Sequence, residues 1–292
     1  IRFVDITEKT GYPVQGAVCS WQTRNGEYNV EHLAGRTPSN ELIVFWWSRL
    51  HDWQAVNVTR KTNHQVVTPV TSWQTKNGPY NVEHLAGVDA SGNLIVFWWS
   101  PQHDWQAVNV SQLTGVRLSG PVTSWQTKNG PYNVEHLAGH DANGNVYVFW
   151  WSPQHDWQAV NVTAKTGQRV RTGLTSWQTK NGPYTVEHLA GVSDTNDVIT
   201  FWWSPQHDWQ AVNVSAKTGR KVTSAVTSWQ TRNGEYNVEH LAGTDANGNL
   251  VVSWWSPLHD WQAVLAPDSA CRKAALSPSA YQVRSDGATA EV

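Results

Sequence analysis

The feature that most constrains the fold is a 52-residue repeat that occurs five times without insertion. The phrase Ser-Trp-Gln-Thr places its Trp at positions 21, 73, 125, 177 and 229. Val-Glu-His-Leu-Ala-Gly places its Glu at 31, 83, 135, 187 and 239, and Trp-Trp-Ser begins at 46, 98, 150, 202 and 254. A fixed period of this length indicates one supersecondary unit stacked on copies of itself.

Each copy consists of short apolar runs separated by turn residues. In the second copy we expect strands at 70–75, 80–87, 94–99 and 105–111, because these runs are rich in β-branched and aromatic residues. Gly, Pro, Asn and Asp between the runs favour turns. No segment shows a helical period. Four antiparallel strands in about 50 residues are typical of a β-propeller blade.

The two ends of the chain favour a closed ring. Residues 3–11 match 159–167 in register, so the chain begins with a copy of the fourth strand. We therefore predict an all-β fold, a five-bladed β-propeller with four antiparallel strands per blade, whose ring is closed by the N-terminal strand. Residues 1–7 complete the last blade or share that task with 261–265, and one of the two segments is surplus. An open β-solenoid is the rival, and it would need capping ends.

The domain prediction follows from the repeat. Residues 1–271 form a single five-bladed propeller, and residues 272–292 form a weakly ordered C-terminal tail. The chain contains no Met, so we expect Ile1 to be a processed start.

The two cysteines lie near the two ends of the repeat array. Cys19 stands where the other copies have Thr, and Cys271 follows the last copy. We predict a disulfide that latches the ring, against the alternative of two unrelated buried thiols. Such a bond indicates an oxidising compartment, so we expect a secreted, extracellular protein.

Composition argues against several partners. The formal net charge is -2 and charged residues make up 15%, so we expect no nucleic acid partner. No apolar stretch approaches the roughly 20 residues of a membrane-spanning helix, so we expect no membrane insertion. The spacing of the repeated His and Asp matches no zinc pattern, and we predict no metal and no cofactor.

Catalysis is also disfavoured. Glycosidases need two carboxylates in unlike roles, whereas each carboxylate of interest here recurs in equivalent form five times. No single Ser is distinguished from its copies for Ser-His-Asp chemistry. We therefore predict that the protein is not an enzyme, with a glycoside hydrolase as the less favoured alternative.

The triplet His-Asp-Trp after the third strand is the most informative motif. A sugar offers hydroxyl pairs for hydrogen bonds and a C–H face for stacking, which an indole beside a carboxylate, imidazole or amide would bind. The alternative is that Asp caps the turn and His packs beneath it. The candidate sugar-binding residues of the five copies, with the second Trp of each pair and the strand Glu, are His51, Asp52, Trp53, Trp47 and Glu31; His103, Asp104, Trp105, Trp99 and Glu83; His155, Asp156, Trp157, Trp151 and Glu135; His207, Asp208, Trp209, Trp203 and Glu187; His259, Asp260, Trp261, Trp255 and Glu239.

Strand periodicity separates the two residues of each Trp pair. Adjacent strand residues face opposite sides, so Trp98 and Trp99 do not share an environment, and at least one packs between blades. Trp73 on the first strand is expected to be packing. A buried Glu83 would need a partner, such as His or Arg from the next blade.

The segment 236–245, continuing through Gly248-Asn249-Leu250 to Trp254-Trp255 and Trp261, resembles a blade of bacterial propeller lectins of the Photorhabdus type. That resemblance implies pockets between blades for fucose- or galactose-like sugars, with Trp99, Trp105 and their copies as stacking residues. The family is usually seven-bladed, and His-Asp-Trp is not part of its pattern. In blade number the chain resembles the horseshoe-crab tachylectin propeller, which binds N-acetylated sugars.

We therefore predict a multivalent lectin with up to five equivalent sugar sites in or between blades, whose glycan partners are fucose, galactose or N-acetylated sugars. A protein–protein interaction scaffold is the alternative, but its exposed loops should diverge, and here they are nearly identical. The first copy has Arg49-Leu50 where the second has Pro101-Gln102. We expect full sites in the second and third copies, which are the most alike.

Overall fold

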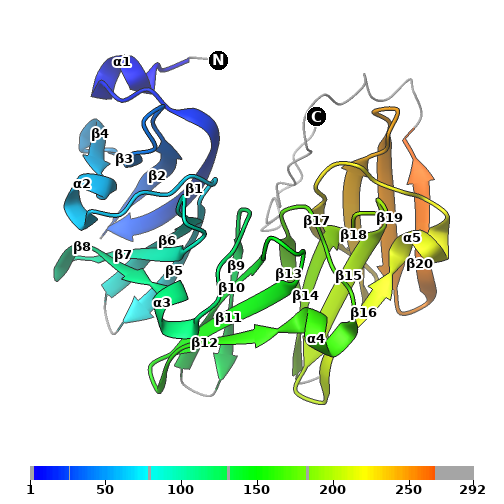
Figure 1. Cartoon of the computed structure of the whole chain (residues 1–292). Helices are drawn as coiled ribbons and strands as arrows, with labels where there is room; N and C mark the ends of the chain where they lie inside the picture. Colours follow the sequence, from blue (N-terminus) through cyan, green and yellow to red (C-terminus); the bar gives the residue numbers. More distant parts are fainter. Residues whose placement is uncertain (1–2, 26, 78–79, 130–131, 182–183, 267–292) are drawn as a thin grey trace. The chain divides into compact units, whose positions relative to one another are not determined.

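The computed structural model describes residues 3–25, 27–77, 80–129, 132–181 and 184–266. Its secondary structure consists of strands with short helices between the sheets (Figure 1). Contacts along the chain group into two compact units that divide after Val162. Each unit is described by itself.

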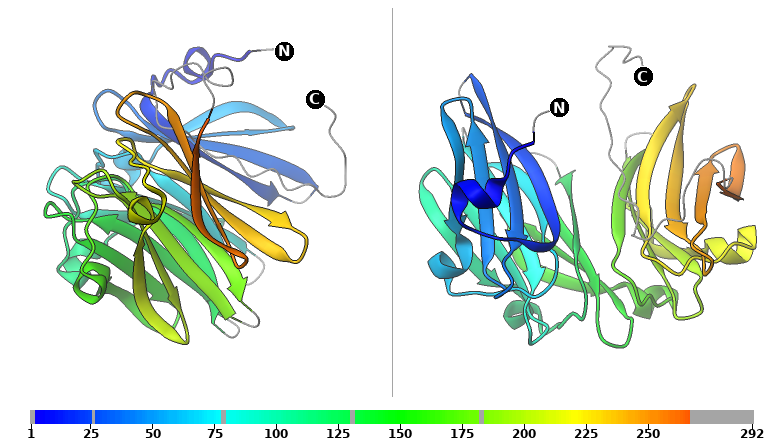
Figure 2. Two further views of the ribbon diagram at one scale, coloured as in Figure 1. Left: turned by 90° about the vertical axis from the view of Figure 1, so that its right-hand side faces the viewer. Right: turned by 90° about the horizontal axis from the view of Figure 1, so that it is seen from above.

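Each repeat forms one four-stranded antiparallel sheet whose strands follow in sequence order, and the twist of these sheets is visible in Figure 2. The first unit holds three sheets. Their strands are β1 (Gln15–Asn25), β2 (Tyr28–Arg36), β3 (Leu42–Ser48) and β4 (His51–Asn57); β5 (Thr71–Asn77), β6 (Tyr80–Val88), β7 (Leu94–Ser100) and β8 (His103–Asn109); β9 (Thr123–Asn129), β10 (Tyr132–His140), β11 (Val146–Ser152) and β12 (His155–Asn161).

The second unit holds two sheets of the same kind. Their strands are β13 (Thr175–Asn181), β14 (Tyr184–Val192), β15 (Val198–Ser204) and β16 (His207–Asn213); β17 (Thr227–Asn233), β18 (Tyr236–Thr244), β19 (Leu250–Ser256) and β20 (His259–Leu265). The helices of the described chain are α1 (Ile6–Thr10), α2 (Val58–Thr62), α3 (Val110–Thr114), α4 (Val162–Thr166) and α5 (Val214–Thr218). The prediction of five all-β units with four antiparallel strands each is confirmed.

The end of each repeat differs from the expectation. In the second copy the fourth strand begins at His103 instead of Trp105, and a helix that the sequence analysis missed follows it. The Asn109 side chain caps this helix by accepting a hydrogen bond from the backbone N–H of Gln112 at 3.0 Å, and Gly115 ends it at φ 75. Five residues are too few to show a helical period, so the capping residues are the sequence signal for this helix.

The prediction that the N-terminal strand closes a ring is wrong. Residues 3–5 belong to no strand, and Ile6–Thr10 forms α1. The match to 159–167 was correct in register, but that segment contains the helix after the fourth strand. Helix α1 contacts β4 as α2 contacts β8, α3 contacts β12 and α5 contacts β20. The fifth sheet takes all its strands, β17–β20, from its own repeat.

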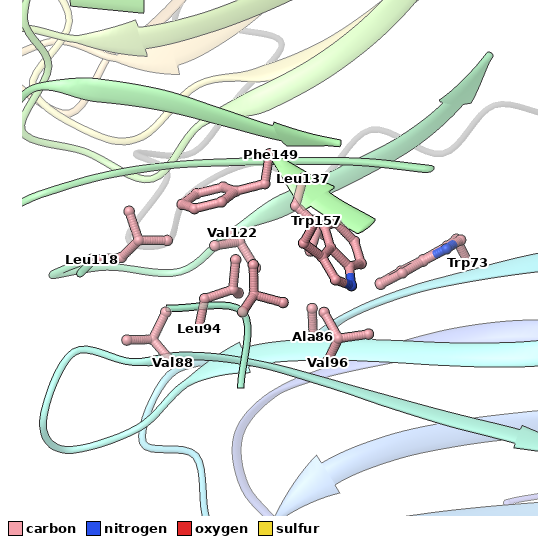
Figure 3. Packing of buried hydrophobic residues seen from close by; sticks show 11 residues of the cluster. Trp73, Ala86, Val88, Leu94, Val96, Leu118, Val122, Leu137, Phe149 and Trp157 are labelled. Carbon is pink, nitrogen blue, oxygen red and sulfur yellow. The ribbon is translucent and has the colours of Figure 1, made fainter. Parts of the chain in front are cut away.

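Consecutive sheets within a unit pack through an apolar core. Between the sheets β5–β8 and β9–β12, Trp73, Leu94 and Val96 meet Phe149 and Trp157 (Figure 3). Phe149 is fully buried, and Trp73 is 7% exposed, so the prediction of a packing role for Trp73 is confirmed. Each buried aromatic side chain of this kind contributes about 1.5–3 kcal/mol through burial. This core holds neighbouring sheets at a fixed separation.

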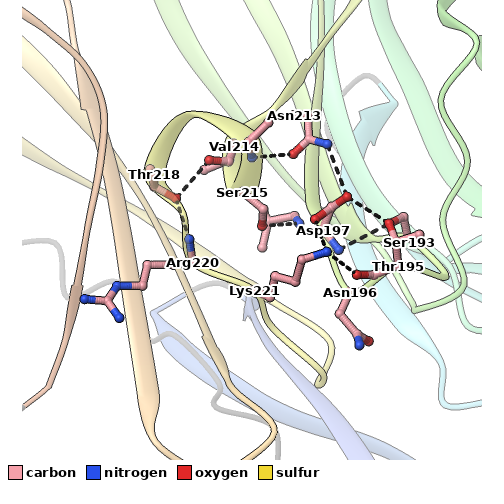
Figure 4. Close-up of polar contacts among 12 residues, drawn as sticks. Ser193, Thr195, Asn196, Asp197, Asn213, Val214, Ser215, Thr218, Arg220 and Lys221 are labelled. Atoms are coloured by element: carbon pink, nitrogen blue, oxygen red, sulfur yellow. Dashed lines mark hydrogen bonds and ion pairs between the residues drawn. The ribbon is translucent and has the colours of Figure 1, made fainter.

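Polar contacts fix the linker helix α5 to the adjacent sheet. In the second unit, Asn213 accepts a hydrogen bond from the backbone N–H of Ala216 and donates to the Asp197 carboxylate at 3.3 Å (Figure 4). Lys221 lies 3.0 Å from the other Asp197 oxygen. Asn196 adopts φ 64, a conformation that Asn tolerates, in a turn that contains no Gly. The linker and the β14–β15 turn therefore form one network.

The disulfide prediction is not supported. Cys19 is a free thiol on β1, and it makes a hydrogen bond with Ser72 of the adjacent sheet. In the next interface the Thr71 hydroxyl meets that of Ser124 at 2.7 Å, so Cys19 occupies an interface position. Burial raises the pKa of the Cys19 thiol to about 11. Cys271 and the predicted tail 272–292 lie outside the described residues, and secretion stays a prediction.

Within the described segments, no helix is long and apolar enough to cross a membrane.

Candidate functional site between consecutive sheets

A cleft of about 600 Å³ opens between the sheets β1–β4 and β5–β8. We call it the first cleft. Valines line its base, and polar and aromatic side chains from both sheets surround them. The preceding sheet contributes Thr23, Arg24, His32 and Trp46, and the following sheet contributes Asn81, Glu83, Trp99, Asp104 and Trp105.

Each sheet supplies the first cleft with a different member of its Trp pair. Trp46 on β3 is the first Trp of its pair, and Trp99 on β7 is the second. Adjacent strand residues face opposite sides, so one sheet presents its first Trp to a cleft that meets the second Trp of the next sheet. Both indoles are partly exposed. The first cleft therefore has two aromatic surfaces, one from each sheet.

A β-bulge places the His-Asp-Trp triplet. Trp98 pairs with Gln106 and Ser100 pairs with His103, so Asp104 and Trp105 together oppose Trp99. The Asp104 carboxylate accepts a hydrogen bond from the Trp105 backbone N–H at 2.8 Å, which stabilises the bulge. The bulge sets Asp104 and Trp105 at the same cleft, although consecutive residues of a regular strand point to opposite faces.

The His of the triplet has another position. His103 is exposed, and its ring meets Trp98 edge-on at 5.6 Å between centroids. It is not among the residues that line the first cleft.

An ion pair holds the Asp of the triplet. Lys61 of α2 donates to Asp104 at 2.6 Å, and this bond with the lysine is the main reason why the pKa of Asp104 is lowered. The Asp104 side chain is 54% exposed. Equivalent pairs join Lys9 to Asp52, Lys165 to Asp208 and Lys217 to Asp260. The third linker helix has Leu113 at the lysine position.

The carboxyl of Glu83 lies deeper in the first cleft. Glu83 is 4% exposed, and its Oε2 accepts a hydrogen bond from the Trp21 indole N–H of the preceding sheet at 3.0 Å. Burial raises the pKa of Glu83 to about 7, although the Trp21 bond acts in the opposite direction. Near neutral pH this carboxyl therefore exists in both protonation states.

His32 completes a cluster with these two residues. Its ring stacks on Trp21 at 5.0 Å with an interplanar angle of 9°, and its Nε2 shares a hydrogen bond with the Thr23 hydroxyl at 2.9 Å. Its Nδ1 lies 3.5 Å from Glu83 Oε2, which is too long for a good hydrogen bond. This buried Nδ1 has no hydrogen-bond partner among the described residues, and burial lowers the pKa of His32 to about 4.

The cluster recurs at the other interfaces described within the two units. Between β5–β8 and β9–β12, Trp73 donates to Glu135 at 3.1 Å, and His84 Nε2 lies 3.6 Å from the carboxyl. In the second unit Trp177 donates to Glu239 at 3.1 Å, and His188 Nδ1 lies 3.5 Å away. A buried Glu was expected to have a His or Arg partner in the next blade. Its hydrogen-bond partner is instead a Trp indole of the preceding sheet, and the His of that sheet lies beside it at 3.5–3.6 Å.

The first cleft brings together four of the five site residues predicted for the second copy, namely Glu83, Trp99, Asp104 and Trp105, and leaves out His103. The predicted positions have the same exposure class in the other copies, except Glu31 and Trp53 of the first copy, which are more exposed than their equivalents. His51, Asp52, His155, Asp156, His207, Asp208, His259 and Asp260 are exposed; Trp47, Trp53, Trp151, Trp203 and Trp255 are half-buried; Trp157, Trp209 and Trp261 are buried, as are Glu135, Glu187 and Glu239; Glu31 is exposed.

Sequence reasoning missed the half of the cleft that comes from the preceding sheet. His32 and Trp46 were visible as repeated residues, but nothing local assigns them to the site of the next copy. Among the described residues, no group of three or more His, Cys, Asp or Glu is placed to hold a metal ion.

No protein-family model matches the chain, and a search of curated proteins gives no match. Solved structures do match in fold. A fungal lectin, described as a six-bladed β-propeller with a novel fucose recognition mode for Aleuria aurantia lectin, is 11% identical with a TM-score of 0.57, over 89% of this chain and 80% of that chain. SapL1 lectin in complex with α-methyl fucoside is 12% identical, with a TM-score of 0.52, over 86% and 81%.

A third similar structure is AofleA from Arthrobotrys oligospora, which is 10% identical with a TM-score of 0.53, over 86% of this chain and 71% of that chain. These likenesses support a β-propeller type of fold. They correct the prediction of a closed five-bladed ring, because the similar fungal lectin has six blades. They also leave the resemblance to the bacterial Photorhabdus type unconfirmed.

Proposed function

We propose that this protein binds carbohydrates, with one sugar in the first cleft and one at each equivalent interface within the two units. The observation that carries the proposal is the first cleft, which is lined by two indoles from neighbouring sheets and by a buried carboxyl and imidazole. A mostly apolar concave site with a few fixed polar groups is the usual form of a small-molecule site.

The chemistry of the first cleft fits a sugar. The faces of Trp46 and Trp99 suit the C–H face of a pyranose. Glu83 uses one carboxyl oxygen for Trp21 and has a second oxygen as a further acceptor, while His32 stacks on the Trp21 indole that holds this carboxyl. At the mouth, Asp104 is held by Lys61 and would meet an outer hydroxyl.

Fucose is the ligand we propose to test first. Two of the structures with a similar fold are a lectin described by its fucose recognition mode and a lectin in complex with α-methyl fucoside. Galactose-like and N-acetylated sugars are the other ligands to compare. Because the Trp, Glu and His cluster recurs, we propose several equivalent sites, whose weak individual affinities add to avidity on a glycan-covered surface. Repeated equivalent sites favour binding over catalysis.

A glycan array followed by calorimetry with methyl α-fucoside tests the proposal. Binding with more than one equivalent per chain is expected. Trp46→Ala, made together with the same change at Trp98, Trp150, Trp202 and Trp254, should weaken binding at least about tenfold, or about 1.4 kcal/mol, by removing one stacking face. Absence of binding to every glycan would overturn the proposal and turn the search to protein partners.

The two carboxylates of the first cleft allow a finer test of which predicted residues touch the sugar. Asp104→Asn with its copies removes the charge at the mouth, and Glu83→Gln with its copies removes the deep one. A larger loss for the Glu83 series would place the sugar against the buried cluster. A larger loss for the Asp104 series would place it at the His-Asp-Trp triplets. Glu41→Gln, which changes a half-buried carboxylate paired with Arg60, is the matched control.

A further inference from the structure

We propose that ligand binding in the first cleft, and at the equivalent interfaces within the two units, is coupled to loss of one proton from the buried Glu–His pair, so that the site holds neutral, hydroxyl-bearing ligands at neutral pH and releases them in mild acid. This inference rests on the proposed function. It concerns Glu83 with His32, Glu135 with His84, and Glu239 with His188.

The geometry leaves one oxygen of the carboxyl for a ligand. Glu83 Oε2 accepts the Trp21 indole N–H at 3.0 Å, and Trp21 is itself fixed by stacking on His32. The Glu83 side chain is 6% exposed and lines the cleft, so a ligand that fills the cleft would meet this carboxyl where bulk water is largely excluded. A hydroxyl of the ligand would replace the water that an ionised carboxylate requires.

The surroundings of Glu83 decide which group titrates. The charged or titratable groups that line the first cleft with Glu83 are Arg24 from β1, His32 from β2 and Asp104 from β8. Burial raises the pKa of Glu83 to about 7 and lowers that of His32 to about 4, while the lysine bond keeps the pKa of Asp104 low. In mild acid the Glu83 carboxyl is therefore protonated and His32 is neutral, and Glu83 loses its proton near neutrality.

Loss of this proton changes what the cleft offers. A protonated Glu83 keeps an O–H donor next to His32 Nδ1, and the His32 Nε2–H then donates to the Thr23 hydroxyl. After ionisation the Nδ1–H faces the carboxylate, and the Thr23 hydroxyl turns to donate to Nε2. The ionised carboxylate accepts a strong, charge-assisted hydrogen bond from a ligand hydroxyl.

The same state selects against acidic ligands. An ionised, poorly hydrated Glu83 repels a ligand carboxylate at the base of the cleft, and Asp104 adds negative charge at the mouth. Neutral sugars donate a hydroxyl without this cost. We therefore expect neutral sugars to bind in preference to sugars bearing a carboxylate.

The sign of the pH effect follows from linkage. A ligand that binds only the ionised form lowers the pKa of Glu83, so binding releases a proton wherever the free cleft is protonated. Affinity should rise about tenfold per pH unit below pH 7 and level off above it. The proton released should fall from nearly one per site at about pH 6 to none at about pH 8.5.

Calorimetry with methyl α-fucoside from about pH 5.5 to 8.5, carried out at each pH in two buffers that titrate there and differ in ionisation enthalpy, measures affinity and proton release together. The comparison variant carries Glu→Gln at Glu83, Glu135 and Glu239 and at the equivalent Glu31 and Glu187. Gln keeps an acceptor for the indole N–H but has no proton to lose, so this variant should bind weakly, with no pH dependence and no proton release. Glu41→Gln should retain the wild-type profile, because Glu41 pairs with Arg60 outside the first cleft.

Measurable sugar binding with a flat pH profile and identical heats in both buffers would overturn the coupling and leave the carbohydrate function intact. Binding to no sugar at any pH would instead overturn the proposed function. If the Gln variant fails to fold, the buffer comparison on the wild-type protein still decides the coupling.

Discussion

Glu83 and Asp104 belong to the same sheet and line the same cleft, yet their surroundings shift the two pKa values in opposite directions. Glu83 is 4% exposed, and burial raises its pKa to about 7. Asp104 is exposed at the mouth, and the bond from Lys61 lowers its pKa. Each carboxylate accepts a hydrogen bond from a nitrogen, the Trp21 indole for Glu83 and the Lys61 ammonium for Asp104, but only Glu83 is shielded from solvent.

The comparison shows that the depth of a carboxyl in the interface matters more than the presence of a partner. At the mouth, water and salt screen the Lys61–Asp104 pair, so it contributes little to stability. At the base, the Trp21–Glu83 contact joins two sheets, and leaving either group unpaired there would be costly. The repeat thus places a weak and a strong polar contact at opposite ends of one cleft.

The largest expected effect is a pH-dependent change in stability on Glu83→Gln. The folded pKa of Glu83 is raised from 4.5 to about 7, so wild-type stability from this group is full below pH 4.5 and falls as pH rises to 7. The Gln variant lacks this loss. Its free energy of unfolding relative to wild type should therefore rise by about 3 kcal/mol between pH 4.5 and 7.5. Urea unfolding at several pH values measures it, and a constant difference would contradict the raised pKa.

The histidines oppose this trend at lower pH. The pKa of His84 is lowered from 6.5 to about 3, so its contribution is full above pH 6.5 and is lost as pH falls to 3. Between pH 4.5 and 6.5 the loss from a Glu and the gain from its His cancel. Each Glu–His pair therefore favours a stability maximum in that window.

A smaller effect is expected for Glu83→Ala at about pH 5.5, where the carboxyl is protonated. The change leaves the Trp21 indole N–H without its acceptor and opens a small cavity, which should cost about 2 kcal/mol. Glu83→Gln at the same pH keeps the acceptor and should cost less than half as much. Equal losses for the two variants would show that the hydrogen bond to Trp21 adds nothing.

The smallest effect is expected at the mouth. Lys61→Ala removes the ion pair with Asp104 and should change stability by less than about 0.5 kcal/mol, with the difference vanishing in high salt. The opposite substitution can be made in α3, where Leu113 occupies the lysine position: Leu113→Lys should add an ion pair with Asp156. Thermal unfolding of both variants at low and high salt checks the ranking. A loss of stability above about 1.5 kcal/mol for Lys61→Ala would show that the Lys61–Asp104 pair stabilises the protein about as much as the Trp21–Glu83 contact does.

The sequence by itself determined the elements that depend on local pattern. The 52-residue period, the alternation in each strand and the turn residues predicted five four-stranded sheets, and the strand bounds of β6 and β7 match to within one residue. Strand periodicity also separated the two Trp of each pair, because side chains alternate between faces. These features need only neighbours within one repeat.

Tertiary structure decided everything that joins one repeat to another. Trp21 and Glu83 are 62 residues apart, and only sheet packing brings His32 and Trp46 into the cleft of the next copy. The bulge at Asp104 and Trp105 broke the alternation from which side-chain directions were read. The N-terminal match was assigned to a strand because a five-residue helix has no period to reveal it. Burial, which sets the protonation of Glu83, is a property of the packed sheets and is absent from any single repeat.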